Sequence, residues 1–406
     1  MIKSLYILLV CYMPILDKYM PKTNFGPGIP DLGPVRFFSY LLIFFFGFEF
    51  VIKKQARLFS KWVGFISLFF IVVLASVSWS KYSYSSSVIQ SISNDIFLPL
   101  IIVVIGLNLF SEGENVDTYI KNILIAAFLL SLISIYQLLS KGVIFTGGES
   151  DMILGRGARS AATLGNPNAL AIFFVLIIPC LIYALEKQLV SRNIGRILSV
   201  FLIFGILCTI SRKGIATGVI AFCIYYYLKR DYKKVVVMGI VVVFSALILS
   251  GFAVFSKRFS QEKLQRDLTG KWIMTYAGLQ MFRGSPLIGL GYQGYYENFG
   301  KYFPYAHWEK YDAHNIFITA LANYGLIGFI PFLGIFLYPV FTSRKVLKAD
   351  NDEESDSIST ELAIVCISSV IPFMINGWFA GGLFNNQVLV VLLYTNISLF
   401  LSKITQ

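Results

Sequence analysis

An acid and an imidazole lie two residues apart in the segment Asp312-Ala313-His314-Asn315. An imidazole titrates near neutral pH and can accept a proton from a hydroxyl group, and a neighbouring carboxylate or amide can orient the ring. The segment therefore predicts general-base chemistry on a hydroxyl substrate, with His314 as the base and Asp312 or Asn315 supporting it. The alternative is that His314 is an interfacial or capping residue where a helix begins.

Arg212 lies in the four-residue connection Ser211-Arg212-Lys213-Gly214, between two apolar runs. A long cationic side chain at such a position can extend towards lipid headgroups and do nothing else. It can also bind an anionic ligand, and the planar guanidinium suits phosphate oxygens better than an ammonium group does. The connection therefore predicts either a lipid-facing arginine or a phosphate contact.

A second pair of arginines, Arg156 and Arg159, lies in a glycine-containing stretch just before Gly165-Asn166-Pro167-Asn168. Asn166 can cap a helix in which Pro167 occupies the first turn. Glycines beside arginines let backbone donors approach an anion closely, although the same pairs occur in ordinary loops. The stretch therefore predicts either an anion contact by Arg156 and Arg159 or an ordinary loop.

The only two histidines, His307 and His314, are seven residues apart. A zinc site needs three or four ligands at suitable spacing, and the segment provides no convincing third ligand. The sequence therefore predicts chemistry without a metal or other cofactor.

These residues belong to a chain that is too apolar to be a soluble globule. Hydrophobic residues make up 56% of the 406 positions and charged residues 14%, and the mean hydropathy is +0.71. Such a composition predicts an all-α, multi-pass membrane protein. About twelve apolar runs approach the length of a membrane-spanning helix: 2–16, 35–52, 62–79, 93–110, 119–139, 167–185, 195–211, 213–228, 234–255, 315–341, 359–379 and 383–402.

The distribution of Lys and Arg predicts the orientation of these helices. Basic residues concentrate in four connections, near residues 53–61, 187–196, 229–234 and 344–348. Loops of this kind face the cytoplasm, so both termini are expected inside and residues 256–314 form one large loop on the outer face. The net charge of +12 then reflects topology, and no cluster is dense enough to predict nucleic-acid binding.

The large loop combines cationic and aromatic residues. The stretch from Trp272 to Phe282 predicts a helix lying on the membrane surface. The run from Tyr292 to Tyr311 is rich in tyrosine, which is typical of an interfacial belt and also of a surface that stacks on sugar rings.

Several of these motifs together resemble the O-antigen ligase-related domain. They are Thr269-Gly270-Lys271, the amphipathic helix after it, Pro286-Leu287-Ile288-Gly289-Leu290-Gly291, His314-Asn315 and Gly325-Leu326-Ile327-Gly328. The domain is shared by bacterial O-antigen ligases, many O-antigen and exopolysaccharide polymerases, and some protein O-oligosaccharyltransferases. The resemblance extends over about residues 195–335 and the 165–168 element.

The resemblance implies a GT-C-like membrane glycosyltransferase that uses a polyprenyl-pyrophosphate-linked glycan at the periplasmic face of the bacterial inner membrane. The Ser-Arg element of the family maps onto Ser211-Arg212, and its histidine maps onto His314. A further family arginine falls on Lys271, which keeps the positive charge but lacks the planar guanidinium fork of arginine. Either Arg266 or Arg283 compensates, or the alignment with the family is shifted. The implied pyrophosphate ligands are then Arg212, Arg156, Arg159 and Lys271.

The acceptor distinguishes the members of such a family. A ligase transfers the finished glycan to lipid A-core, a polymerase transfers it to another lipid-linked repeat unit, and a protein ligase transfers it to Ser or Thr. We expect the ligase type, with the polymerase as the alternative and a lipid-linked glycan flippase or transporter as a remoter one. The partners are then the donor, the acceptor and membrane lipids.

The predicted organisation has four parts. Residues 1–194 form the N-terminal transmembrane helices, and 195–341 form the ligase-related core with the periplasmic loop 256–314. Residues 342–358 form an acidic, Ser-rich cytoplasmic connector, and 359–406 form the C-terminal transmembrane helices.

Overall fold

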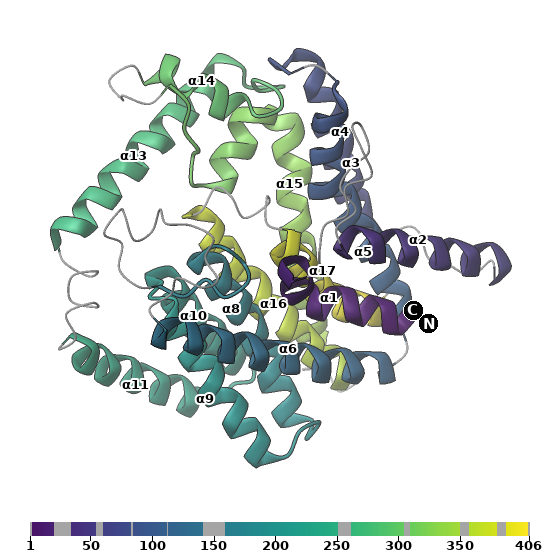
Figure 1. The fold of residues 1–406 in the computed structure, drawn as a ribbon, viewed down its shortest axis with the longest axis vertical. Helices are drawn as coiled ribbons and strands as arrows, with labels where there is room; N and C mark the ends of the chain where they lie inside the picture. The colour runs from purple at the N-terminus through teal and green to yellow at the C-terminus, as the bar shows by residue number, and fades with distance from the viewer. Residues whose placement is uncertain are drawn as a thin grey trace.

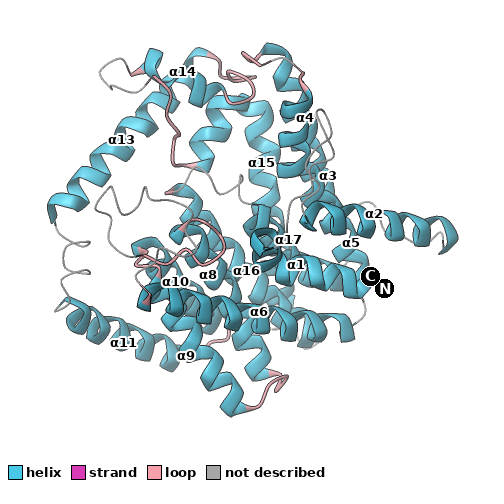
Figure 2. Cartoon of the chain, viewed as in Figure 1, coloured by secondary structure: helices cyan, strands magenta, loops and turns pink. Residues whose placement is uncertain are grey.

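The fold is that of a computed structural model, which describes residues 2–19, 34–53, 60–82, 84–111, 113–140, 159–250, 261–303, 309–349, 357–379 and 387–404. Over these ranges the regular structure is helical and contains no strand, as Figure 2 shows. The expectation of an all-α protein is therefore confirmed for the described residues.

Helices occupy all twelve of the predicted apolar runs. The N-terminal part contains α1 (Ile2–Tyr19), α2 (Pro34–Lys53), α3 (Lys61–Ser76), the 3-10 turn η1 (Val77–Trp79), α4 (Ser86–Ile92), the π-helical turn η2 (Ser93–Phe97), α5 (Leu98–Leu109) and α6 (Gly113–Leu139). The remainder contains α8 (Pro167–Glu186), α9 (Arg192–Cys208), α10 (Arg212–Leu228), α11 (Tyr232–Ser250), α13 (Gln261–Gly284), α14 (Gly294–Tyr302), α15 (Ile316–Ala349), α16 (Ser357–Trp378) and α17 (Gln387–Ile404).

Five helical stretches among the described residues are long and apolar enough to cross a membrane. They are Lys61–Trp79, Glu114–Leu139, Pro167–Glu186, Ile316–Ala349 and Ile358–Trp378. Shorter apolar helices cover Ile2–Tyr12, Ser39–Phe48, Leu98–Leu109 and Val388–Ile404. A helical membrane protein is thus supported, whereas twelve crossings and the orientation of the chain stay predictions.

The centre of the helical assembly is α8, whose side chains from Ala169 to Ala184 are almost all buried. It packs against α6, α9, α10, α16 and α17 (Figure 1). A buried amide on α17, Asn396, donates to the carbonyl oxygen of Leu176 at 3.0 Å and to Ser369 Oγ at 3.2 Å. Interhelical hydrogen bonds of this kind fix how two helices are oriented relative to each other, which apolar packing alone specifies weakly.

The described residues between α11 and α15, 261–303 and 309–315, are largely helical, and α13 and α14 lie against α15. Helix α13 extends beyond the predicted 272–282 at both ends and crosses α15 where Gly278 faces Ile318; a Cβ at Gly278 would lie 2.2 Å from Ile318 Cγ2. After α13 the chain turns through 286–291 into α14, at the top of Figure 1. Whether this segment lies in the periplasm stays a prediction.

Two glycine motifs of the sequence pair with each other by their backbones. Within the 286–291 turn, Leu290 N donates to Ala322 O at 2.9 Å and Gly291 N to Asn323 O at 2.8 Å. In the opposite direction, the amide nitrogens of 326 and 327 donate to Pro286 O at 2.9 Å and Leu287 O at 3.1 Å. The turn can reach α15 only because the helix is interrupted there and has unpaired donors and acceptors to offer.

The interruption is at Gly325, which has φ 57° and ψ −160°. This region of backbone space is essentially restricted to glycine. A Cβ at this position would also lie 2.4 Å from the backbone of Leu287. Gly325 therefore divides α15 into residues 316–324, which lie under α13 and α14, and 326–349, about 36 Å long and sufficient to cross a bilayer.

We predict that Gly325→Ala destabilises the protein by about 2 kcal/mol or more, because it adds backbone strain and a clash with the docked turn. Thermal unfolding in detergent measures the effect as a lower midpoint. Gly64→Ala in α3 is the matched control, because a Cβ there has no heavy atom within 4 Å. Equal midpoints for the two variants would show that the docked turn does not depend on Gly325.

Candidate functional site

Arg212 and Lys213 are the first two residues of α10, directly after its cap. Ser211 Oγ accepts from Gly214 N at 3.2 Å and so caps the helix. The preceding turn is tight, and Ile210 has φ 48°, an uncommon conformation for a β-branched residue. The partial positive charge of a helix N-terminus adds to the two side-chain cations, which makes this end of α10 suited to an anion.

A hydrogen-bond network joins this helix start to the start of α8. Ser211 Oγ donates to Asn168 Oδ1 at 2.9 Å, and the guanidinium of Arg159 donates to the same oxygen at 3.2 Å. Arg159 Nε also donates to Thr209 O at 2.9 Å, at the end of α9. Asn166 caps α8 as predicted, accepting from Asn168 N at 2.8 Å. Arg159 thus ties two helix N-termini together; its predicted contact with a phosphate stays a prediction.

Sequence reasoning missed the residue that holds the segment directly after Arg159. Gln137 of α6 is 1% exposed, and its Oε1 accepts from Ser160 Oγ at 2.7 Å, Ala161 N at 3.1 Å and Ala162 N at 2.8 Å. Its Nε2 donates to Ala162 O at 3.1 Å. A glutamine inside an apolar run was the only signal in the sequence, and such a residue usually has a specific partner in the membrane.

A second missed residue, Lys213, meets the predicted Lys271 at the end of α16. Lys213 Nζ donates to the carbonyl oxygen of Phe379 at 2.7 Å, and Lys271 Nζ lies 4.6 Å from the centre of the Phe379 ring. The start of α10, the middle of α13 and the end of α16 therefore converge on Phe379. This convergence brings two cations from distant parts of the sequence to one place.

His314 lies beside these lysines, in the connection that enters α15. It has φ 48°, retains partial access to solvent and contacts the Tyr311 ring edge-on at 5.5 Å. Loss of hydration lowers the pKa of His314; the charge of Asp312 opposes this effect, and the charges of Lys213 and Lys271 add to it. The lowered pKa favours the neutral imidazole, which is the form that a general base requires.

Asn315 is a structural residue in this geometry. Its Oδ1 accepts from Phe317 N at 3.0 Å and Ile318 N at 3.1 Å, and it is 3% exposed. It therefore caps α15 and fixes the backbone from which His314 projects. Asn315 thus acts on the start of the helix, and its expected support of the imidazole stays a prediction.

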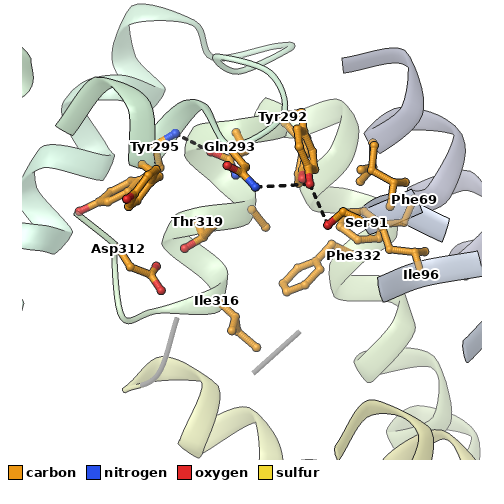
Figure 3. A pocket seen from close by; sticks show the side chains of 16 residues that line it. Phe69, Ser91, Ile96, Tyr292, Gln293, Tyr295, Asp312, Ile316, Thr319 and Phe332 are labelled. Carbon is orange, nitrogen blue, oxygen red and sulfur yellow. Dashed lines mark hydrogen bonds between the residues drawn. The ribbon is translucent and has the colours of Figure 1, made fainter. Parts of the chain in front are cut away.

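Asp312 lines a cavity of about 380 Å³ between α3, α4, α14 and the first part of α15. Figure 3 shows its carboxylate beside Thr319, across the cavity from Ser91, Phe69 and Phe332. The other lining residues are Val73, Ile92, Ile96, Tyr292, Gln293, Tyr295, Tyr296, Ile316, Ala320, Asn323 and Tyr324. Part of the tyrosine-rich run therefore lines this cavity.

Not every predicted residue joins the site. Arg283 is exposed in the last turn of α13, about 18 Å along the helix from Lys271, so it is too distant to replace the family arginine there. Arg156 and His307 lie outside the described residues, as does the side chain of Arg266. Among the residues that the structure describes, no three His, Cys, Asp or Glu side chains gather at one point.

The charges around His314 generate a prediction about its titration. Asp312→Asn should lower the pKa of His314 further, and Lys271→Met should raise it, because each removes one of the opposing charges. Histidine resonances in NMR measure this directly, since the chain has only two histidines and His307→Gln assigns them.

Lys345→Met, a change in the last turns of α15, is the control and should leave the titration unchanged. If transfer activity depends on neutral His314, its acid limb should move in the same directions as the pKa. Identical titration curves in all variants would mean that these charges do not act on the imidazole.

Comparison with known proteins bears on the segment that contains most of the site. Residues 197–333 match the protein-family model described as O-antigen ligase, whereas no curated protein matches the chain. The matched segment runs from within α9 to within α15 and includes Arg212, Lys271 and His314. Over these residues the chain is therefore similar to the O-antigen ligase family.

Proposed function

We propose that the protein is a membrane glycosyltransferase that moves a glycan from a polyprenyl-pyrophosphate carrier to an acceptor hydroxyl. The observation that carries the proposal is the convergence of Lys213 and Lys271 on Phe379, beside the neutral imidazole of His314. Fixed cations next to a base suit a reaction in which a phosphate-bearing group leaves and a hydroxyl attacks.

In the proposed reaction, the acceptor oxygen attacks the anomeric carbon of the donor while His314 takes the hydroxyl proton. A new carbon–oxygen bond forms to the acceptor as the bond from the anomeric carbon to the phosphate oxygen breaks. The electron pair leaves with the polyprenyl pyrophosphate. The imidazolium then returns its proton to solvent, so that the enzyme is regenerated.

The charge on the leaving pyrophosphate is the main electrostatic requirement of this step. Arg212 and Lys213 at the N-terminus of α10, together with Lys271 on α13, provide cations and a helix dipole of the required sign. Because pyrophosphate is already a good leaving group, the proposal includes no metal ion. Arg159 and Arg156 are proposed as further donors to the phosphates.

We propose the ligase type, in which lipid A-core is the acceptor, in surface-polysaccharide biosynthesis at the periplasmic face of a bacterial inner membrane. Both termini are then cytoplasmic. The family match supports a ligase or polymerase in general terms. An O-antigen or exopolysaccharide polymerase, with a lipid-linked repeat unit as acceptor, is the alternative that the same site supports.

Arg212→Ala should abolish glycan transfer, with loss of at least about a hundredfold in rate, because a phosphate-binding cation acts where charge develops. Arg192→Ala is the matched control: Arg192 follows the cap Ser191 at the start of α9, as Arg212 follows Ser211 at the start of α10. Arg192 lies at the far end of α9, about 25 Å from the site. Equal activity of the two variants at equal membrane abundance would remove Arg212 from the reaction.

The acceptor can be identified from the glycans of a strain that lacks the gene, complemented with wild type or His314→Ala. Mass spectrometry of lipid-linked and lipid A-linked glycans provides the measurement. Long chains retained on the polyprenyl carrier are the expected result for a ligase, and single repeats on lipid A-core would instead indicate a polymerase. An unchanged profile would contradict both forms of the proposal.

A further inference from the structure

The cavity beside Asp312 differs in chemistry from the cationic surface on the other side of His314. Of the described residues that line the cavity, only Asp312 carries a formal charge at neutral pH, and none is a lysine or arginine. A carboxylate in such a space repels phosphate, and no lining cation compensates for it. The cavity is therefore unsuited to the pyrophosphate of a donor.

The remaining lining groups suit an uncharged ligand with many hydroxyls. Hydroxyl and amide groups come from Ser91, Gln293 and Thr319, and rings come from Tyr292, Tyr296 and Phe69. A sugar ring has apolar C–H faces that pack on aromatic rings, and equatorial hydroxyls that bond to carboxylates, amides and hydroxyls. The volume of about 380 Å³ is within the range of about 300–1,000 Å³ that small-molecule sites occupy.

The wall of the cavity is held by hydrogen bonds among its own lining residues and to neighbouring segments. Tyr292 Oη donates to Ser91 Oγ at 3.2 Å, and Gln293 Oε1 accepts from Tyr82 Oη at 2.9 Å. Glu297 of α14 accepts from Tyr82 Oη at 2.8 Å and from Lys310 Nζ at 2.9 Å, so it joins three chain segments. Asn323 Oδ1 accepts from Tyr295 N at 2.7 Å, which attaches α14 to α15. Preformed walls of this kind reduce the ordering that binding would otherwise require.

We propose that this cavity binds saccharide residues of the acceptor, and that Asp312 accepts a hydrogen bond from one of their hydroxyls. The assignment of the saccharide to the acceptor rests on the proposed transferase function. The proposal that the cavity binds a sugar rests on its lining residues alone. Asp312 is two residues from His314, so a sugar bound here presents a hydroxyl close to the base. The donor's phosphates then bind on the lysine side of His314, and the two substrates approach the imidazole from different directions.

Two variants test the cavity in the purified full-length protein. Ala320→Leu adds bulk at a buried lining position, and Tyr296→Ala removes a ring that is 43% exposed and so contributes little to the core. Ala216→Leu, at an exposed position on α10, is the matched control for the added bulk. Thermal unfolding checks that each variant is folded. If Ala320→Leu fails to fold, Tyr296→Ala still tests the cavity.

Two probes are used with each variant. Saturation-transfer NMR measures binding of simple methyl glycosides and of delipidated oligosaccharide released from the host strain's own envelope. Phosphorus NMR measures binding of inorganic pyrophosphate. We expect both cavity variants to weaken saccharide binding at least about tenfold and to leave pyrophosphate binding unchanged, with Arg212→Ala showing the opposite pattern.

Saccharide binding that is absent from the wild type, or equal in wild type and both variants, would overturn the proposal. So would a loss of pyrophosphate binding in place of saccharide binding. The transferase function is judged separately: saccharide binding that depends on the cavity, with no glycan transfer by the wild type, would contradict that function and leave the sugar site standing. If Arg212→Ala abolishes transfer but the cavity variants bind saccharide as the wild type does, the transferase function stands and the sugar site is contradicted.

Discussion

The arrangement of the site depends on the interruption of α15 at Gly325. Because this glycine leaves the helical conformation, backbone groups of residues 322–327 become available to the 286–291 turn, and four hydrogen bonds join the two segments. The turn connects α13 to α14, so its position determines where Lys271 lies on one side and where the cavity wall lies on the other. A continuous helix would have no unpaired groups to hold the turn.

A second consequence of this geometry is the separation of charge around His314. Lys213 and Lys271 meet at Phe379, at the end of α16, whereas Asp312 faces the cavity. The opposing charges act on one imidazole, whose pKa is lowered because loss of hydration and the two lysines outweigh the acid. The cationic groups and the carboxylate therefore lie on different sides of one imidazole.

The cationic side is supported by buried polar residues within the helical assembly. Gln137 makes four hydrogen bonds to residues 160–162, and this segment leads directly from Arg159. Backbone strain accompanies the support, since Ala162, Ile210 and His314 are non-glycine residues with positive φ, each close to a candidate site residue. Strained conformations persist only where the surroundings hold them, and they concentrate at functional sites.

The sequence by itself determined the all-helical class, the helical character of the apolar runs and the cap at Asn166. These features follow from local periodicity, composition and capping chemistry, which short stretches of chain carry in full. It also carried the ligase motif, and the family match over 197–333 supports it. The helix predicted at 272–282 was correct in type but too short, because its first turns lack apolar periodicity.

Only the tertiary structure decided which of the candidates meet. Arg283 shares a helix with Lys271 but lies about 18 Å further along it. Lys213, Gln137 and Phe379 were not recognised because their partners lie far away in the sequence. The glycine motifs at 286–291 and 325–328 were recognised as a family pattern, yet their pairing depends on a long-range backbone contact that no local pattern encodes. The cavity likewise exists only because four separate helical segments enclose it, and enclosure is a property of packing rather than of any one segment.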